Sequence, residues 1–165
     1  MVRARVEKKD HEAIYFHGTQ YAHAGLGLQK DMRKAVELWT EAAELSSAGA
    51  LYSLGVAYRL GSGVEEDEAK GTQFYEKAAM QGCVQSRYTL GLLDAKEKNH
   101  DRAAMHLLIS AKMGHKNSIE MIIKAFMSGH ATREQYTEAL RGYQDALEET
   151  KSHDRDEAKR LGYPR

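Results

Sequence analysis

The chain has 165 residues, of which 42% are hydrophobic and 29% are charged. Its 24 lysines and arginines balance its 24 aspartates and glutamates, so it lacks the net positive field that gives proteins non-specific affinity for nucleic acids. A chain of this length can bury about 70% of its extended-chain surface, which is enough for one core or one continuous stack of elements. We therefore expect one globular or repeat domain without a nucleic-acid partner.

The residue usage also bears on compartment and secondary structure. The single cysteine, Cys83, excludes an intramolecular disulfide and disfavours a secreted disulfide framework. No signal-peptide core is visible, and no stretch approaches the about 18 consecutive apolar residues of a membrane span. Alanine, leucine, glutamate and lysine are common, and the one proline lies beside the C-terminus, which favours helix. We expect an all-α chain in the cytoplasm, with no membrane association.

A sequence pattern that recurs after 36 residues organises the chain. The corresponding residues of the first two copies are Gly25, Gly27, Leu28, Asp31, Lys34 and Trp39, and Gly61, Gly63, Val64, Asp67, Lys70 and Tyr75. A third copy lacks the glycine loop, and a fourth follows it. Such a period is typical of repeat proteins. After a helix tail or solenoid start at residues 1–12, we place the four copies at residues 13–49, 50–85, 86–117 and 118–150.

Each copy has the apolar spacing of two helices, which we call helix A and helix B. In the fourth copy, Ile119, Ile122, Ile123 and Phe126 follow the i, i+3, i+4, i+7 pattern of a helix face. The residues predicted to cap helix B are Asp31, Asp67 and Asn99 in the first three copies, and a capping box of Thr132 and Gln135 in the fourth. The glycine loop therefore joins helix A to helix B.

The glycine pairs could suggest a phosphate-binding loop. A dinucleotide-binding motif needs a strand before its glycines and a Walker loop needs Gly-Lys-Ser/Thr, whereas here a helix precedes them and neither motif is complete. In the second copy Glu65, Glu66 and Asp67 would repel a phosphate. We interpret the pair as a helix terminator in which one glycine has a positive φ angle.

These linked positions, together with Ala50–Tyr58 and the alanine pairs Ala42-Ala43 and Ala78-Ala79, resemble the Sel1-like repeat family. The members of this family are relatives of tetratricopeptide repeats with a longer loop between helices A and B. The resemblance covers about residues 13–150, although His17 replaces a usual leucine and Ile123 a usual glycine. It implies a right-handed α-solenoid of about four helix pairs, followed at residues 151–165 by a short C-terminal capping helix and tail.

The pattern also predicts how neighbouring helices pack. Small residues at Gly18, Gly55 and Gly91 remove bulk where helices cross, and large residues fill the space between successive layers. These large residues are Trp39, Tyr75, Leu107 and Tyr143. Because a single pair cannot bury its apolar faces, we expect stability to come from stacking on neighbouring pairs.

Catalytic and metal chemistry find little support in the sequence. His11-Glu12 begins like a zinc-protease motif but the second histidine is absent. His17 and His23 are six residues apart, which places them on nearly opposite sides of a helix rather than at the i, i+4 spacing that converges on zinc. Cys83 has no histidine at a meaningful spacing. We predict no catalytic residue, no metal and no cofactor.

The resemblance implies a non-catalytic adaptor or scaffold that binds a peptide or protein on the concave helix A face. The predicted partner-binding residues are Tyr15, Thr19, Tyr52, Val56, Arg59, Tyr88, Leu92 and Lys96. The alternative interpretation of the tyrosines is packing between helices. Two further classes stay open: a structural subunit whose solenoid another chain completes, and a hydrolase-like activity. We expect a monomer or a subunit of a hetero-complex.

Overall fold

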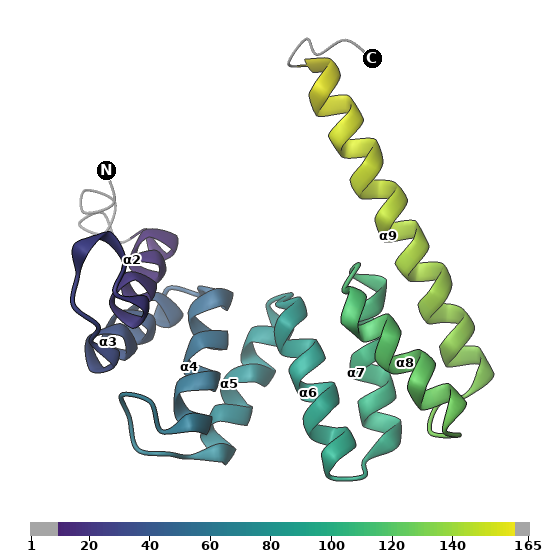
Figure 1. Cartoon of the computed structure of the whole chain (residues 1–165), viewed down its shortest axis with the longest axis horizontal. Coiled ribbons are helices and arrows are strands. Elements are labelled where there is room, and N and C mark those ends of the chain that lie inside the picture. Colours follow the sequence, from purple (N-terminus) through teal and green to yellow (C-terminus); the bar gives the residue numbers. More distant parts are fainter. Residues whose placement is uncertain (1–9, 161–165) are drawn as a thin grey trace. The chain divides into compact units, whose positions relative to one another are not determined.

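The computed structural model describes residues 10–160, and within that range the chain contains helices and no strand (Figure 1). In chain order the elements are α2 (His11–His23), the 3-10 turn η1 (Gly25–Gly27), α3 (Met32–Glu44), α4 (Ala48–Leu60), α5 (Glu68–Met80), α6 (Val84–Lys96), α7 (His100–Lys112), α8 (Lys116–Met127) and α9 (Arg133–Arg160). The prediction of an all-α chain is confirmed for these residues. Most of the expected N-terminal segment, residues 1–9, and the last residues of the tail, 161–165, lie outside the described residues.

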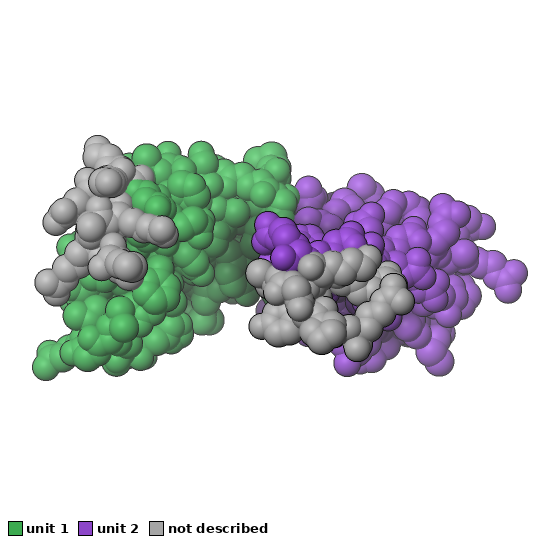
Figure 2. Space-filling model, turned by 90° about the horizontal axis from the view of Figure 1, so that it is seen from above, with its two compact units in different colours: residues 1–86 green, residues 87–165 purple. Residues whose placement is uncertain are grey.

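The chain forms two compact units (Figure 2). Unit 1 comprises residues 1–86 and unit 2 comprises residues 87–165, so the boundary falls in the first turn of α6. Within unit 1, α2 packs on α3 and α4 packs on α5, while α3 contacts α4. Within unit 2, α9 packs on both α7 and α8. The predicted order of alternating A and B helices is therefore present in both units.

Side chains at the starts of the B helices act as predicted at three of the four positions. The carboxylate of Asp31 accepts from the Lys34 N–H at 3.0 Å, and that of Asp67 accepts from the Lys70 N–H at 2.9 Å. At α9 the capping box is complete, because the Thr132 N–H donates to Gln135 Oε1 at 2.8 Å and the Gln135 N–H donates to Thr132 Oγ1 at 3.2 Å. Asn99 occupies the cap position of α7, but its side chain makes no capping hydrogen bond.

The first glycine loop differs from the second by one residue. Helices α2 and α4 begin at His11 and Ala48, whereas α3 and α5 begin at Met32 and Glu68, so the first loop is one residue longer. As a result Ala24, with φ 55°, and not Gly25, takes the left-handed cap position that Gly61 takes with φ 62°. The predicted correspondence of Gly25 with Gly61 is therefore wrong in the structure. The extra residue of the first loop, Leu26, also has a left-handed backbone, with φ 52°.

Gly63 combines a positive φ angle with a close approach to α3. Its φ is 78°, and a Cβ atom built on it would lie 2.5 Å from the carbonyl oxygen of Met32. We expect Gly63→Val to lower the free energy of unfolding by about 2 kcal/mol, because it adds left-handed strain to a backbone clash. Urea denaturation measures this loss. Gly27→Val is the matched control, since Gly27 has φ 73° with nothing within 4 Å of its Cβ position; equal losses would exclude the contact with Met32 as a cause.

The predicted pairing of small with large residues is present, but each contact lies within one helix pair. A Cβ atom on Gly18 would lie 2.8 Å from Trp39 Cδ1, and one on Gly91 would lie 2.9 Å from Leu107 Cγ. The third pair of this kind, Gly55 with Tyr75, is the closest at 2.5 Å. These glycines therefore allow helix A to approach the large residue of its own helix B.

The last helix is longer than expected. The predicted short C-terminal helix is not a separate element, because residues 151–160 continue α9 without interruption. The physical reason is that no glycine or proline lies between Gly142 and Gly162, and the intervening residues are mostly good helix formers. Among residues 10–160 no helix, α9 included, is both long and apolar enough to cross a membrane.

Candidate functional site

A groove of about 410 Å³ opens on unit 1 among residues of α2, α3, α4 and the two A-to-B loops. We call it the unit 1 groove, and its volume lies in the range typical of ligand sites. Its lining residues are Tyr15, Thr19, Ala22, His23, Lys30, Met32, Trp39, Tyr52, Ser53, Val56, Ala57, Leu60 and Ser62. The structure thus brings together Tyr15, Thr19, Tyr52 and Val56 from the predicted binding set.

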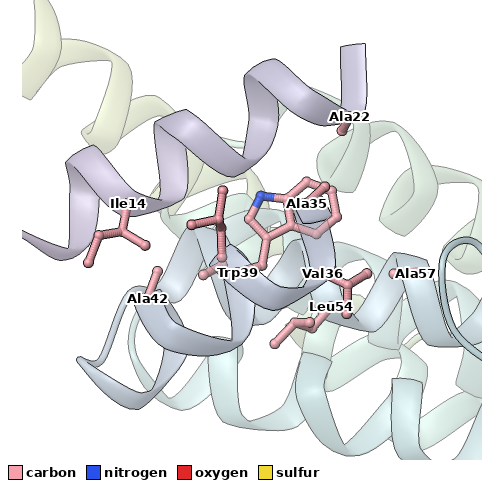
Figure 3. Close-up of a cluster of buried hydrophobic side chains, with 10 residues drawn as sticks. Ile14, Ala22, Ala35, Val36, Trp39, Ala42, Leu54 and Ala57 are labelled. Carbon is pink, nitrogen blue, oxygen red and sulfur yellow. The ribbon is translucent and has the colours of Figure 1, made fainter. Parts of the chain in front are cut away.

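The floor of the groove is apolar. Trp39, Ala22 and Ala57 line it and are 6%, 5% and 2% exposed. Figure 3 shows the indole of Trp39 directed towards the helix that carries Ala22. Gly18 makes this position possible, because any side chain there would displace the indole. The floor is therefore part of the hydrophobic core of unit 1, which makes it a rigid surface for a ligand.

Hydroxyl groups lie above this floor. The Thr19 hydroxyl donates to the Tyr15 carbonyl at 3.0 Å and accepts from Trp39 Nε1 at 3.4 Å, so it is held in place. Among the described residues, nothing forms a hydrogen bond with the hydroxyl of Tyr15 or Tyr52, and both side chains are half-buried. These two hydroxyls can therefore donate to, or accept from, the backbone of a bound peptide.

The edge of the groove carries one exposed apolar side chain and a positive charge. Leu60, the last residue of α4, is 70% exposed. Lys30 is exposed, and none of the described residues that line the groove is acidic. An apolar floor with tyrosine hydroxyls and a lysine at its edge suits an apolar side chain that has a carboxylate nearby.

The helix A tyrosines also pack on neighbouring elements. A Cβ atom on Gly49 would lie 2.9 Å from Tyr15 Cε1, so the Tyr15 ring covers the start of α4. The ring centroid of Tyr52 lies 5.5 Å from that of Tyr75, and burial raises the pKa of Tyr75 to about 12. In unit 2 the Tyr88 ring lies 4.7 Å from that of His115. Tyr15 and Tyr52 therefore both pack on neighbouring residues and line the unit 1 groove.

The other predicted binding residues lie outside the unit 1 groove. The guanidinium of Arg59 donates to Thr72 Oγ1 at 3.2 Å and pairs with Glu68 at 3.5 Å, which ties it to α5. Tyr88 and Leu92 are half-buried in unit 2 and Lys96 is exposed there. Sequence reasoning missed Leu60, although it continues the i, i+4 series of Tyr52 and Val56 along one helix face.

One arrangement in unit 2 has the geometry of a nucleophile and its base. Ser118 Oγ lies 2.8 Å from His115 Nδ1 and 2.6 Å from Ser110 Oγ. Burial lowers the pKa of His115, but both serines are fully buried, so their hydroxyls cannot meet a substrate. This network instead joins α7 to α8. Among residues 10–160, no three or more histidine, cysteine or acidic side chains are grouped to hold a metal ion.

The fold defines the chain as an α-helical repeat protein, and comparison with known proteins identifies the repeat. Residues 11–47, 48–83 and 87–115 match the model of the Sel1 repeat. The chain therefore belongs to the Sel1 repeat family, whose members are generally protein-interaction scaffolds. The matched segments correspond to the pairs α2–α3 and α4–α5 and to most of α6–α7, while α8 and α9 lie beyond them.

Solved structures show the same helical-repeat solenoid. A Sel1 repeat protein from Oxalobacter formigenes is 25% identical, with a TM-score of 0.75 over 89% of this chain and 62% of that one. A protective antigen of uropathogenic Escherichia coli strains with an SLR fold is 26% identical, with a TM-score of 0.76 over 90% of this chain and 32% of that one. The chain is also 30% identical over 82 residues to chitin synthase regulatory factor 3 of Schizosaccharomyces pombe, of which it spans 9%.

Proposed function

We propose that this chain is a non-catalytic binding module that holds a short segment of a protein partner in the unit 1 groove. The observation that carries the proposal is one groove that contains both an apolar floor at Trp39 and the hydroxyls of Tyr15 and Tyr52, which have no hydrogen-bond partner within residues 10–160. The general role of Sel1 repeat proteins as interaction scaffolds supports it. So does the name of the Schizosaccharomyces pombe relative, which describes a regulatory factor.

The chemistry of the groove specifies the segment. A bulky apolar side chain would cover Trp39 and contact Val56 and Leu60, where burial of apolar surface supplies the binding free energy. The hydroxyls of Tyr15 and Tyr52 would bond to its backbone. Because Lys30 is the charged residue of the groove and no described lining residue is acidic, we propose that an aspartate or glutamate lies near the apolar residue of the partner.

The test uses peptides selected on the purified chain from a displayed random library. Leu60→Glu is expected to weaken binding of the selected peptides at least tenfold, or about 1.4 kcal/mol, because it places a carboxylate at the apolar edge of the groove. The measurement is the Kd by fluorescence anisotropy. Leu60 is 70% exposed, so the change is expected to leave the melting temperature unaltered.

The matched control is Met80→Glu. Met80 is 76% exposed and ends α5 as Leu60 ends α4, but it does not line the groove. It should change the Kd less than twofold. Selection that enriches no apolar–acidic motif, or the same loss of affinity in both variants, would refute the groove as the binding site.

A further inference from the structure

Unit 2 contains a pocket of about 250 Å³ that involves α7, α8, the end of α6 and the turn after α8. We call it the unit 2 pocket. Its apolar floor includes Leu107, Ala103 and Ala104, which are 2%, 4% and 1% exposed. One lysine and two histidines also line it: Lys124, His100 and His130.

The unit 2 pocket occupies the same place in its repeat as the unit 1 groove occupies in its own. Helices α3 and α7 begin at Met32 and His100, and α4 and α8 begin at Ala48 and Lys116, a shift of 68 residues in both cases. The same shift carries the groove residues Met32, Trp39, Val56, Ala57 and Ser62 to the pocket residues His100, Leu107, Lys124, Ala125 and His130. The repeat therefore builds one type of cavity twice.

The substitutions between the two cavities change the chemistry from apolar to cationic. The floor stays apolar, since Leu107 takes the place of Trp39. At the edge, however, His100 replaces Met32 and Lys124 replaces Val56. The rings of His100 and His130 are stacked, with centroids 3.9 Å apart and an angle of 6° between their planes, so each fixes the orientation of the other. An imidazole keeps at least one N–H donor in either protonation state.

No acidic side chain compensates this charge inside the pocket. None of the described lining residues is acidic, and within residues 10–160 Lys124 forms no ion pair. The nearby carboxylate of Asp94 is buried on α6 and lies 3.4 Å from Arg102 Nε and 3.6 Å from His106 Nε2. Its charge is therefore already matched by the guanidinium of Arg102 on α7.

We propose that the unit 2 pocket is a second binding site, which takes the carboxylate side chain of a glutamate or aspartate on a protein partner. Lys124 supplies the ionic contact, and the ring N–H groups of His100 and His130 supply hydrogen bonds. The methylene groups of the bound side chain contact the floor at Leu107. The cavity is small, so it suits one side chain rather than a nucleotide-sized ligand.

The experiment compares two blocked pentapeptides that differ only in charge, acetyl-Ala-Glu-Ala-Glu-Ala-amide and acetyl-Ala-Gln-Ala-Gln-Ala-amide. Methyl NMR shifts of Ala103 and Met121, which line the pocket, report binding to the full chain. We expect the glutamate peptide to shift these signals in a saturable way and the glutamine peptide to bind at least fivefold more weakly. Lys124→Gln should weaken the glutamate peptide at least fivefold.

Lys116→Gln is the matched control, since Lys116 is exposed on the same helix and does not line the pocket. It should leave the Kd of the glutamate peptide within twofold. Equal shifts with both peptides, equal effects of the two lysine changes, or saturation by inorganic phosphate but not by the glutamate peptide would overturn the proposal. Leu60→Glu should not alter this binding, so failure of the unit 1 groove and failure of the unit 2 pocket are distinguishable.

Discussion

Replacement of Trp39 by alanine is expected to lower the free energy of unfolding by about 3–5 kcal/mol. The indole is 6% exposed and belongs to the core of unit 1 with Ile14, Val36 and Leu54. Its removal leaves a cavity beside Gly18, which has no side chain to fill the space. Because each repeat depends on its neighbours for burial, the loss falls on α2, α3 and α4 together.

The measurement is urea denaturation followed by far-UV circular dichroism, since Trp39 is the only tryptophan and its fluorescence disappears with the substitution. Phe16→Ala is the control, because Phe16 also lies on an aromatic-rich helix pair but is 43% exposed. Its loss should stay below about 1 kcal/mol. A loss for Trp39→Ala as small as that of Phe16→Ala would show that the indole is not the central core residue of unit 1.

The features that sequence reasoning predicted are those that local chemistry determines. The helix pairs follow from apolar spacing, and the caps at Asp31 and Asp67 follow from the demand of first-turn N–H groups for acceptors. The contact between Gly18 and Trp39 follows from the repeat, because the same small and large positions recur in the first three copies. A period in the sequence thus specifies a period in packing.

The features that sequence reasoning did not predict depend on the exact length of a loop or on which side chains the folded chain leaves exposed. The sequence alignment of Gly25 with Gly61 did not reveal the additional residue in the first loop. The left-handed position there is taken by Ala24, and such positions are usually occupied by glycine. Leu60 has an apolar side chain of the kind that usually lies in a core, and only the structure shows that it is 70% exposed at the edge of a groove. Likewise His100 and His130 are 30 residues apart, and the turn after α8 brings their rings together.

The comparison of the two cavities suggests how a repeat protein diversifies its surfaces. The floor of each cavity belongs to a core, and its residues stay apolar because burial stabilises the stack. The edge residues Val56 and Lys124 are free of that demand and differ in chemistry. Binding specificity can therefore change at the edge without a change in fold.

The contact between Gly55 and Tyr75 gives the second large effect, because it is the closest of the three contacts between a helix A glycine and the large residue of its helix B. Its Cβ position lies 2.5 Å from Tyr75 Cδ1 and 3.1 Å from the backbone oxygen of Gly71, so a side chain here meets a buried ring and a helix backbone. We expect Gly55→Val to lower the free energy of unfolding by about 3 kcal/mol or more, at the upper end of the overpacking range. Chemical denaturation measures the loss, and Val56→Ala on the same helix is the control, with an expected loss of about 1 kcal/mol.

The contact between Gly91 and Leu107 suggests how this clash can be relieved. There Gly91 faces Leu107, which is smaller than Tyr75 and holds the same position in the repeat. Tyr75→Leu alone should destabilise the chain, because it removes a buried ring and its contact with Tyr52. In the double variant with Gly55→Val, the valine occupies part of the space that the ring leaves. The double variant should therefore lose less free energy of unfolding than the sum of the two single losses, by more than about 1 kcal/mol. If instead the losses add to within about 0.5 kcal/mol, the backbone of Gly71, and not the ring of Tyr75, limits the size of residue 55.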